Sequence, residues 1–321
     1  MVHRAFHAIQ QPMTLRSTGE EVRGVYGFAN TFLKVLADWN PAHCAIAFDM
    51  RAPTFRHLKY KEYKAHRPEA PPELYAQFPK VRQLMEAFEV PIYEMEGFEA
   101  DDILGTLSRL AAEQELETII LTGDTDTLQL VSPWVRVLLQ HSVQKREIYD
   151  VNAVRERYGG LGPTQQPDIK GLQGDPSDNI PGVPGIGTKT AVKLIQEFGS
   201  IEELYQNLDS VTPPRIQELL REHREQAFQG KELTTIFNEM DIELDLEAMR
   251  FGGFDREKVL ATFREFEFSR MVDRIPGATV PVQGMLLAEE RPTSSTNVQR
   301  DYVTVDTAGA LSAMLEELRS G

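Results

Sequence analysis

The sequence predicts an α/β fold for the first half of the chain and a helical region for the second half. Up to about residue 151, short apolar segments alternate with amphipathic segments of helical period, a pattern typical of a parallel sheet covered by helices. From residue 152 onward, Gly and Pro turns separate helical segments, and few segments have the composition of a strand. The length of 321 residues also suits about two domains.

Each predicted element of the first half has its own signature. A helix is predicted at 25–37 because Phe28, Phe32 and Leu36 recur at helical spacing. The apolar run at 44–48 predicts a short buried strand that ends at an aspartate. In chain order, the remaining predictions are a helix at 77–88, a strand that begins at 91, a helix at 100–115, and strands at 118–121 and 135–139.

Changes in composition divide the chain into predicted segments. These are an α/β domain at 1–151, a helical region at 152–275, a linker at 276–299 and a last segment at 300–321. The linker is predicted from its Pro and Gly residues and a Thr-Ser-Ser-Thr stretch. The last segment begins like a strand and continues like a helix. It is too short to bury a core, so we expect it to open a domain that the sequence does not complete.

Composition excludes several classes of protein. Hydrophobic residues make up 41% and charged residues 26% of the chain, as in an ordinary soluble globular protein. No apolar run approaches the ~18 residues of a spanning helix, and the first residues lack the apolar stretch of a secretory signal. The single cysteine, Cys44, cannot form an intramolecular disulfide, so we expect a cytoplasmic protein without a membrane partner. The net charge of −15, taken alone, argues against a nucleic-acid protein.

Acidic side chains gather where predicted strands and loops end. Asp49 and Asp124 each follow a predicted strand, and the carboxyl ends of parallel strands share one edge of a sheet, so we expect them to meet. Taken singly, each acid has an ordinary explanation as a helix start or a turn residue. Together they would repel one another without cations. The full set is Asp49, Glu99, Asp101, Asp102, Asp124, Asp126, Asp175 and Asp178.

The chemistry of this acidic set predicts metal ions. Carboxylates without a set of His or Cys ligands favour Mg²⁺ or Mn²⁺ over zinc. Two such ions in one pocket suit the hydrolysis of a phosphodiester, because one activates water and both stabilise the displacement. Bound ions would also offset much of the negative charge, so the acidic total does not exclude DNA as a partner.

A basic and aromatic segment, residues 51–67, follows directly after Asp49. It carries six Arg or Lys residues against one acid, Glu62, and three aromatic residues are interleaved with them. Positive charge attracts phosphates, and aromatic rings offer stacking surfaces to unpaired bases. A solvated basic helix is the alternative explanation, but the position next to the acids favours binding of a single strand.

The segment at 180–191 carries the most specific local pattern. Its three glycines permit close approach of a phosphate to backbone N–H groups, and Thr188 is expected to cap a helix whose N-terminus favours an anion. This pattern resembles the helix-hairpin-helix motif, which binds duplex phosphates. A nucleotide P-loop does not fit because threonine stands at its lysine position, and a D-x-D-x-T phosphatase pattern at 124–128 lacks its threonine. The residues assigned to DNA contact are Gly182, Gly185, Gly187, Thr188, Lys189 and Lys193.

These motifs together resemble the 5′ nuclease domain of bacterial DNA polymerase I, a member of the flap endonuclease family. The resemblance runs from about His3 to Arg274, and it implies a parallel-sheet nuclease core with a helical arch, followed by the helix-hairpin-helix region. The motifs are Tyr-Gly-Phe at 26–28, Phe-Asp at 48–49, Pro-Thr-Phe-Arg at 53–56, Tyr-Lys-Ala-His-Arg at 63–67, Glu-Ala-Asp-Asp at 99–102, Leu-Thr-Gly-Asp-Thr-Asp at 121–126 and Gly-Asp-Pro-Ser-Asp-Asn at 174–179.

The resemblance also implies roles for single residues. Lys64 would contact the scissile phosphate, and Arg4 is assigned as a second catalytic residue. The hairpin would hold the downstream duplex, with K⁺ bound there. The expected ligands of one metal ion are Asp49, Glu99, Asp101, Asp102 and Asp124, those of a second ion are Asp126, Asp175 and Asp178, and the arch residues expected to contact DNA are Arg56, Tyr63, Lys64 and Arg67.

The implied activity is that of a Mg²⁺-dependent 5′-3′ exonuclease and 5′-flap endonuclease of DNA replication and repair. It would act as a monomer on DNA with 5′ flaps, nicks or free 5′ ends, fused to a polymerase in its parent. The family opens with an apolar strand that ends in Asp-Gly, whereas residues 2–7 here already match the helix after that strand. We therefore expect reduced stability and poor cleavage. The alternative function is a DNA-junction binder that has an incomplete metal site and does not cut.

Overall fold

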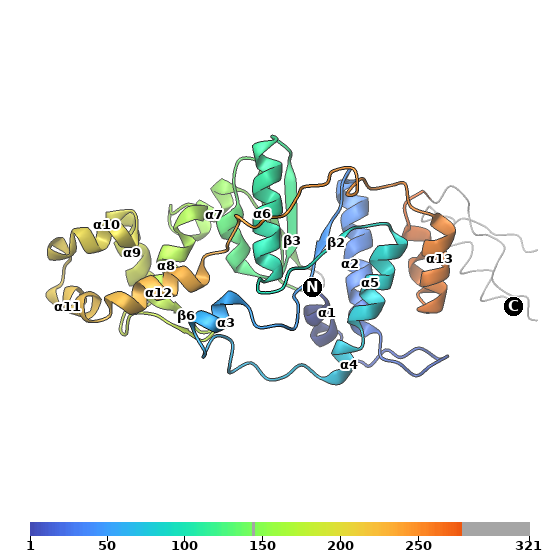
Figure 1. Ribbon diagram of the computed structural model, residues 1–321, viewed down its shortest axis with the longest axis horizontal. Helices are drawn as coiled ribbons and strands as arrows, with labels where there is room; N and C mark the ends of the chain where they lie inside the picture. Colours follow the sequence, from blue (N-terminus) through green and yellow to red (C-terminus); the bar gives the residue numbers. More distant parts are fainter. Residues whose placement is uncertain (143–144, 278–321) are drawn as a thin grey trace, which may run out of the picture. The chain divides into compact units, whose positions relative to one another are not determined.

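The α/β prediction for the first half of the chain is confirmed, with the strands in two small sheets (Figure 1). β1 (Ile46–Ala47) and β2 (Ile92–Tyr93) pair in parallel. β3 (Thr118–Thr122) and β4 (Val135–Gln140) also pair in parallel, and β5 (Arg146–Tyr149) pairs with β4 in the antiparallel direction. The loops that leave the carboxyl ends of β1 and β3 carry predicted site residues.

The structure is a computed structural model that describes residues 1–142 and 145–277. The predicted linker beyond residue 277, and the predicted strand and helix of the last segment, lie outside the described residues. Within the described part of the chain, no helix combines the length and the apolar character that crossing a membrane requires.

β5 is not predicted from the sequence, because its side chains alternate only weakly between apolar and polar. Within β5, Tyr149 is buried, whereas Ile148 is 37% exposed and the two preceding residues are charged. β5 pairs with β4 in the antiparallel direction at the edge of this sheet, so several of its side chains remain in water. The second sheet is therefore mixed rather than purely parallel.

The three helices predicted in the first half are confirmed. They are α2 (Arg23–Trp39), α5 (Phe78–Ala87) and α6 (Ala100–Glu113). α1 (Val2–Ala8) precedes them and packs against α2 through its buried residues. Glu99 and Asp102 form a capping box at the start of α6, which explains why an acidic sequence begins this helix.

The basic segment at 51–67 forms a short helix followed by turns, and then a second short helix, α4 (Pro72–Tyr75), begins. The first of these helices is α3 (Phe55–Lys59), and Tyr60 and Tyr63 of the segment lie beyond its end. Lys64 adopts a left-handed φ of 55°, and its N–H donates to the carbonyl oxygen of Asp178 at 2.9 Å. A loop of the second half therefore fixes the backbone of this segment.

Helices dominate the second half, as predicted. In Figure 1, α8 to α12 lie together at one end of the described chain, around a shared apolar core. In chain order, the elements after β3, apart from β4 and β5, are η1 (Thr125–Leu130), α7 (Val151–Arg157), η2 (Pro163–Gln165), α8 (Gln166–Gln173), the paired hairpin strands β6 (Gly174–Asp175) and β7 (Ile180–Pro181), α9 (Thr188–Phe198), α10 (Ile201–Gln206), η3 (Leu208–Ser210), α11 (Pro214–Glu222), α12 (Arg224–Thr234), α13 (Arg256–Glu265) and η4 (Ser269–Arg274).

Two glycines bring α8 and α12 into close contact. A Cβ atom at Gly171 would lie 2.6 Å from the carbonyl oxygen of Ala227, and one at Gly230 would lie 3.2 Å from the Cα atom of Gly171. Because atoms at such distances overlap, any larger residue at Gly171 would push the two helices apart. α8 leads directly into β6, so this contact determines where the hairpin of β6 and β7 lies.

The chain returns to the first half at the end of its described part. α13 packs against α5, and aromatic rings from both halves meet around Phe88. The Phe88 ring lies 5.0 Å from that of Phe254 and 6.2 Å from that of Phe263, both edge to face. Residues 251–275 therefore share a core with α2 and α5, although the sequence analysis assigns them to the helical region at 152–275.

Candidate active site

The loop after β3 presents two aspartates at the carboxyl end of that strand. The Asp124 carboxylate accepts a hydrogen bond from the N–H of Asp126 at 3.0 Å, and the Asp124 carbonyl oxygen accepts one from Thr127 Oγ1 at 2.7 Å. Asp124 thereby caps η1, a position that aspartate favours. The Asp124 side chain remains exposed and that of Asp126 is half-buried.

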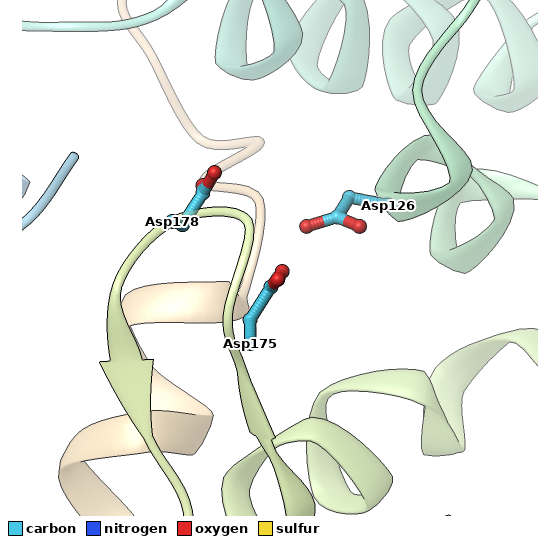
Figure 2. A group of neighbouring side chains, drawn as sticks. All are labelled: Asp126, Asp175 and Asp178. Carbon is cyan, nitrogen blue, oxygen red and sulfur yellow. The ribbon is translucent and has the colours of Figure 1, made fainter. Parts of the chain in front are cut away.

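The hairpin of β6 and β7 brings two more aspartates to Asp126. Figure 2 shows Asp126 from η1 facing Asp175 and Asp178 from the hairpin. One carboxylate oxygen from each of the three residues lies within 4.8 Å of the other two. Asp175 is buried, and Ser177 donates to it from the N–H at 2.9 Å and from the hydroxyl at 2.6 Å. Two segments that are distant in sequence thus form one carboxylate triad, Asp126, Asp175 and Asp178.

A lysine from α8 is the counter-ion of the triad. Lys170 Nζ donates to the Asp126 carboxylate and, at 2.6 Å, to that of Asp175. Burial raises the pKa of Asp126 to about 7, against the effect of Lys170. For Asp175 the effect of burial is outweighed by Lys170 and Ser177, which lower its pKa. Near neutral pH, Asp126 therefore lies between its two protonation states, whereas Asp175 is ionised.

Lys170 does not stand out in the sequence as a site residue. Lys170 lies in the last turn of α8, where a basic residue is ordinarily explained by the helix dipole. Between Lys170 and Asp175 the helix ends, and Gly174 adopts a left-handed φ of 81°. This change of direction brings the side chains of Lys170 and Asp175 together. The spacing of these two residues along the sequence does not reveal it.

A second group of carboxylates surrounds Asp101. Burial raises the pKa of Asp101 well above its usual range, and the charges of Asp124, Asp49 and Glu99 raise it further. Asp49 accepts a hydrogen bond from the N–H of Ala100 at 2.8 Å, which joins the loop after β1 to the start of α6. The structure thus brings Asp49 and Asp124 to one site, together with two acids from the start of α6.

The structure pairs two of the predicted site residues, Arg56 and Asp102, with each other. Arg56 donates to both carboxylate oxygens of Asp102 at 2.8 Å, and the two side chains are 4% and 0% exposed. Asp102 also accepts from the N–H groups of Glu99 at 3.0 Å and Phe237 at 2.9 Å. Arg56 also donates to the carbonyl oxygen of Leu233 at 2.9 Å. Because these contacts occupy both groups, we infer that the pair supports the site from within.

The other predicted arch residues lie on two of the acids. The Tyr63 hydroxyl lies 2.9 Å from a Glu99 oxygen and 3.0 Å from an Asp178 oxygen. Burial and these two carboxylates raise the pKa of Tyr63. Lys64 Nζ lies 2.6 Å from Glu99 and 3.7 Å from Asp178, and the Arg67 guanidinium donates to Asp178. The cations expected to contact DNA therefore neutralise predicted metal ligands in this structure.

Arg4 lies beside the loop after β3. Its guanidinium donates to the carbonyl oxygen of Gln140 at 3.0 Å, so the end of β4 holds it. A Cβ atom at Gly123 would overlap the Arg4 side chain. The glycine immediately before Asp124 therefore allows an arginine of α1 to approach the second carboxylate group.

The glycines of the predicted helix-hairpin-helix have different roles. A Cβ atom at Gly182 would lie 2.1 Å from the carbonyl carbon of Gln173, so the packing of the hairpin requires this glycine. Gly185 adopts a left-handed φ of 82°, whereas Gly187 has an ordinary φ of −94° and open space around it. The predicted cap is wrong, because the N-cap of α9 is Gly187 and Thr188 is already helical. The other predicted hairpin residues, Thr188, Lys189 and Lys193, are exposed on the first turns of α9.

Both carboxylate groups suit a hard divalent cation in the chemistry of their donors. The triad offers three oxygen ligands from two loops, without sulfur or imidazole donors, as Mg²⁺ and Mn²⁺ prefer. In the second group, burial is the first cause of the raised pKa of Asp101, and the charges of Asp124, Asp49 and Glu99 add to it. A cation bound in either group would relieve this repulsion.

The raised pKa of Asp126 predicts that stability falls with rising pH when divalent ions are removed. Its pKa of about 7 lies above the unfolded value of about 3.9, so the folded state binds the proton more tightly. This contribution is present at low pH and is lost as pH rises through about 7. In EDTA we expect Asp126→Asn to reduce the fall of Tm between about pH 5 and pH 8. The exposed Asp209→Asn should leave the fall unchanged, and an unchanged slope in Asp126→Asn would contradict the assignment.

Removal of the Lys170 ammonium tests the counter-ion. Lys170→Met keeps the aliphatic stem but leaves the Asp126 and Asp175 carboxylates without their cation, which costs about 3 kcal/mol in a buried pair, so Tm in EDTA should fall. Lys231→Met is a matched control, because Lys231 is similarly exposed and pairs with Asp168 at 2.6 Å. Added Mg²⁺ should restore more of the Tm in Lys170→Met than in Lys231→Met. Equal recovery in both variants would argue against an ion at the triad.

Two family models match the chain in order. The 5′-3′ exonuclease N-terminal resolvase-like domain matches residues 1–159, and the 5′-3′ exonuclease C-terminal SAM fold matches residues 161–257. The chain is 45% identical over 295 residues to DNA polymerase I of Chloroflexus aurantiacus and 44% identical over 276 residues to DNA polymerase I of Bacillus caldotenax. These alignments cover 90% and 86% of this chain and 31% of each relative, so the chain spans about a third of their length.

Solved structures share the fold at lower identity. A zinc-bound T5 5′-exonuclease aligns with a TM-score of 0.56 and 22% identity, over 76% of this chain and 90% of its own. The catalytic core of Rad2 in complex with DNA substrate aligns with a TM-score of 0.57 and 15% identity, over 85% and 88%. These structures confirm the architecture, and the two family models, matched in order, show that this chain belongs to the 5′-3′ exonuclease family.

Proposed function

We propose that this chain hydrolyses DNA phosphodiesters as a 5′-3′ exonuclease and 5′-flap endonuclease in replication and repair. The observation that carries the proposal is the carboxylate triad, in which Asp126 meets Asp175 and Asp178 within 4.8 Å. Acids from the start of α6 and from the loops after β1 and β3 form a second group around Asp101. Two such groups, next to a basic segment, suit the hydrolysis of a phosphodiester with two divalent ions.

The proposed ions are Mg²⁺, one at the triad and one at the second group. When bound, such ions lower the pKa of water and offset the charge that develops on the phosphate. Lys64 and Arg67 are the arch cations closest to the acids, and they would exchange carboxylate oxygens for phosphate oxygens as DNA enters. Arg56 and Asp102 would keep the start of α6 in place throughout.

The proposed partner is DNA with a 5′ flap, a nick or a free 5′ end. The segment at 51–67 would receive the single strand, and the hairpin with α9 would hold the duplex, with K⁺ bound at the hairpin. The Rad2 core was solved with DNA substrate, which supports DNA as the partner. The chain would act as a monomer, and the name of the curated relatives, DNA polymerase I, supports fusion to a polymerase domain in its parent.

A DNA-junction binder that does not cut is the second candidate. The observation that favours it is the engagement of Asp102 with Arg56, because it leaves the second carboxylate group with one free acid fewer. Cleavage of a 5′-flap oligonucleotide in Mg²⁺ distinguishes the two functions. A chain that binds the flap but never cuts it would establish the second candidate.

Asp124→Asn tests the separation of chemistry from binding. Asparagine is an equally good N-cap, so η1 should form as before. We expect flap cleavage in Mg²⁺ to fall by about a hundredfold, while flap binding in EDTA, measured by fluorescence anisotropy, is retained or strengthened because one repulsive charge is gone. Cleavage at the original rate would remove Asp124 from the site.

Two hairpin glycines separate a binding role from a packing role. Gly187→Asn keeps a favoured N-cap residue but fills the open space, so it should weaken duplex binding equally for all sequences and leave Tm nearly unchanged. Gly182→Ala should lower Tm, because its Cβ atom would overlap the backbone of Gln173. Anisotropy with two unrelated duplexes and thermal melting provide the measurements. A loss in Gly187→Asn that depends on the sequence of the duplex would contradict a phosphate-binding hairpin.

A further inference from the structure

A hollow of about 580 Å³ lies between the end of α7 and the start of α9. Arg157, Tyr158 and Gly159 line it from the α7 side, and the first two turns of α9, with Lys189 and Lys193, line it from the other. The two family models meet at this place, since one ends at residue 159 and the other begins at residue 161. The hollow therefore belongs to neither half alone.

The side chains of the hollow have the charge of an anion site. As the structure describes it, the lining contains three cations and no carboxylate. All three cations are exposed. The α9 helix, 11 residues long, starts at a glycine without a side chain to cap its first N–H groups, so these groups add to the positive potential.

Arg157 is held in place before any ligand arrives. Its guanidinium donates to the Tyr149 hydroxyl at 2.8 Å, and it lies 5.6 Å from the centre of the Tyr149 ring and 5.7 Å from that of Tyr158. A guanidinium has five N–H donors, so several remain for an anion. Because the side chain is already ordered, binding costs little conformational entropy.

The helix dipole is the ordinary explanation for a basic residue at this place, and it applies equally to Arg155 and Arg157. Arg155 and Arg157 both lie in the last turn of α7, where the dipole favours cations. Arg157, but not Arg155, lines the hollow and contacts two aromatic rings. Arg155 is therefore a matched control of the same type, on the same helix and also exposed.

We propose that this hollow binds a phosphate of the DNA backbone, with Arg157 on one side and Lys189 and Lys193 on the other. The proposal rests on the proposed DNA-binding function and extends it, because the duplex held by the hairpin would also contact the end of α7. The guanidinium and ammonium groups recognise a phosphodiester by charge-assisted hydrogen bonds. No base edge is involved, so the contact carries no sequence preference.

Binding of a 5′-flap duplex to the full chain in EDTA, measured by fluorescence anisotropy over a range of salt concentrations, tests the proposal. Arg157→Ala should weaken binding about tenfold, the loss of one charge-assisted hydrogen bond. It should also flatten the plot of log affinity against log salt by about 0.9. Arg155→Ala should change both quantities little. Arg157→Lys keeps the charge, so its affinity for the duplex should lie between those of Arg157→Ala and the original chain. This variant distinguishes a loss of charge from a loss of folding if Arg157→Ala has a lowered Tm.

Three outcomes would overturn the proposal. In the first, Arg157→Ala and Arg155→Ala bind the duplex with equal affinity, while Lys189→Ala binds it more weakly. The hairpin would then be the duplex site, and the hollow would be excluded. Failure of the original chain to bind the flap duplex would overturn the proposed function itself, and the hollow with it. In the third, inorganic phosphate raises the Tm of the original chain but not that of Arg157→Ala, while both chains bind DNA with equal affinity. The hollow would then be a site for free phosphate.

Discussion

Repulsion between carboxylates is the constraint on which the arrangement of this chain depends. The acids come from separate segments, and cations from other elements contact each group. Lys170 of α8 lies in the triad, Lys64 lies on Glu99, and Arg56 of α3 lies on Asp102. These ion pairs join the basic segment to the start of α6, and another joins α8 to the loop after β3. The carboxylates that would bind metal ions therefore also hold the surrounding elements together through their ion pairs.

The cations differ in how readily they can exchange partners. Arg56 is 4% exposed and donates to carbonyl oxygens as well as to Asp102, so its removal would leave a buried charge unpaired. Lys64 and Arg67 lie near the end of the basic segment and are 22% and 48% exposed. Lys64 contacts Glu99, and Arg67 contacts Asp178. Exposed ion pairs are weak, so Arg67 can turn to a phosphate at little cost, whereas Lys64 and its partner Glu99 are both largely buried. The cations of this basic segment thus differ in how firmly they are held.

The sequence predicts the helices and the meeting of the acids, because both follow from local period and from the shared edge of parallel strands. It does not separate Arg56 from Lys64, or Asp102 from Asp101, because neighbouring residues of one motif differ only in which way they face. Lys170 escapes prediction since a glycine turn brings it to Asp175. The return of α13 to α5 likewise depends on which rings meet around Phe88, and spacing along the chain does not encode that.

The contact between Gly171 and Gly230 has a consequence for the distance between the two carboxylate groups. α8 ends next to the triad, through Lys170 and β6, whereas the carbonyl oxygens of Leu233 and Thr235 at the end of α12 receive Arg56 at 2.9 and 2.8 Å. The two helices therefore set the distance between the two carboxylate groups. They can approach each other this closely because Gly171 and Gly230 have no side chains. A methyl group added there would change the separation of two groups that it does not touch. Reactions of this kind tolerate errors of less than about 1 Å, so the packing of two glycines remote from the carboxylates bears directly on the chemistry.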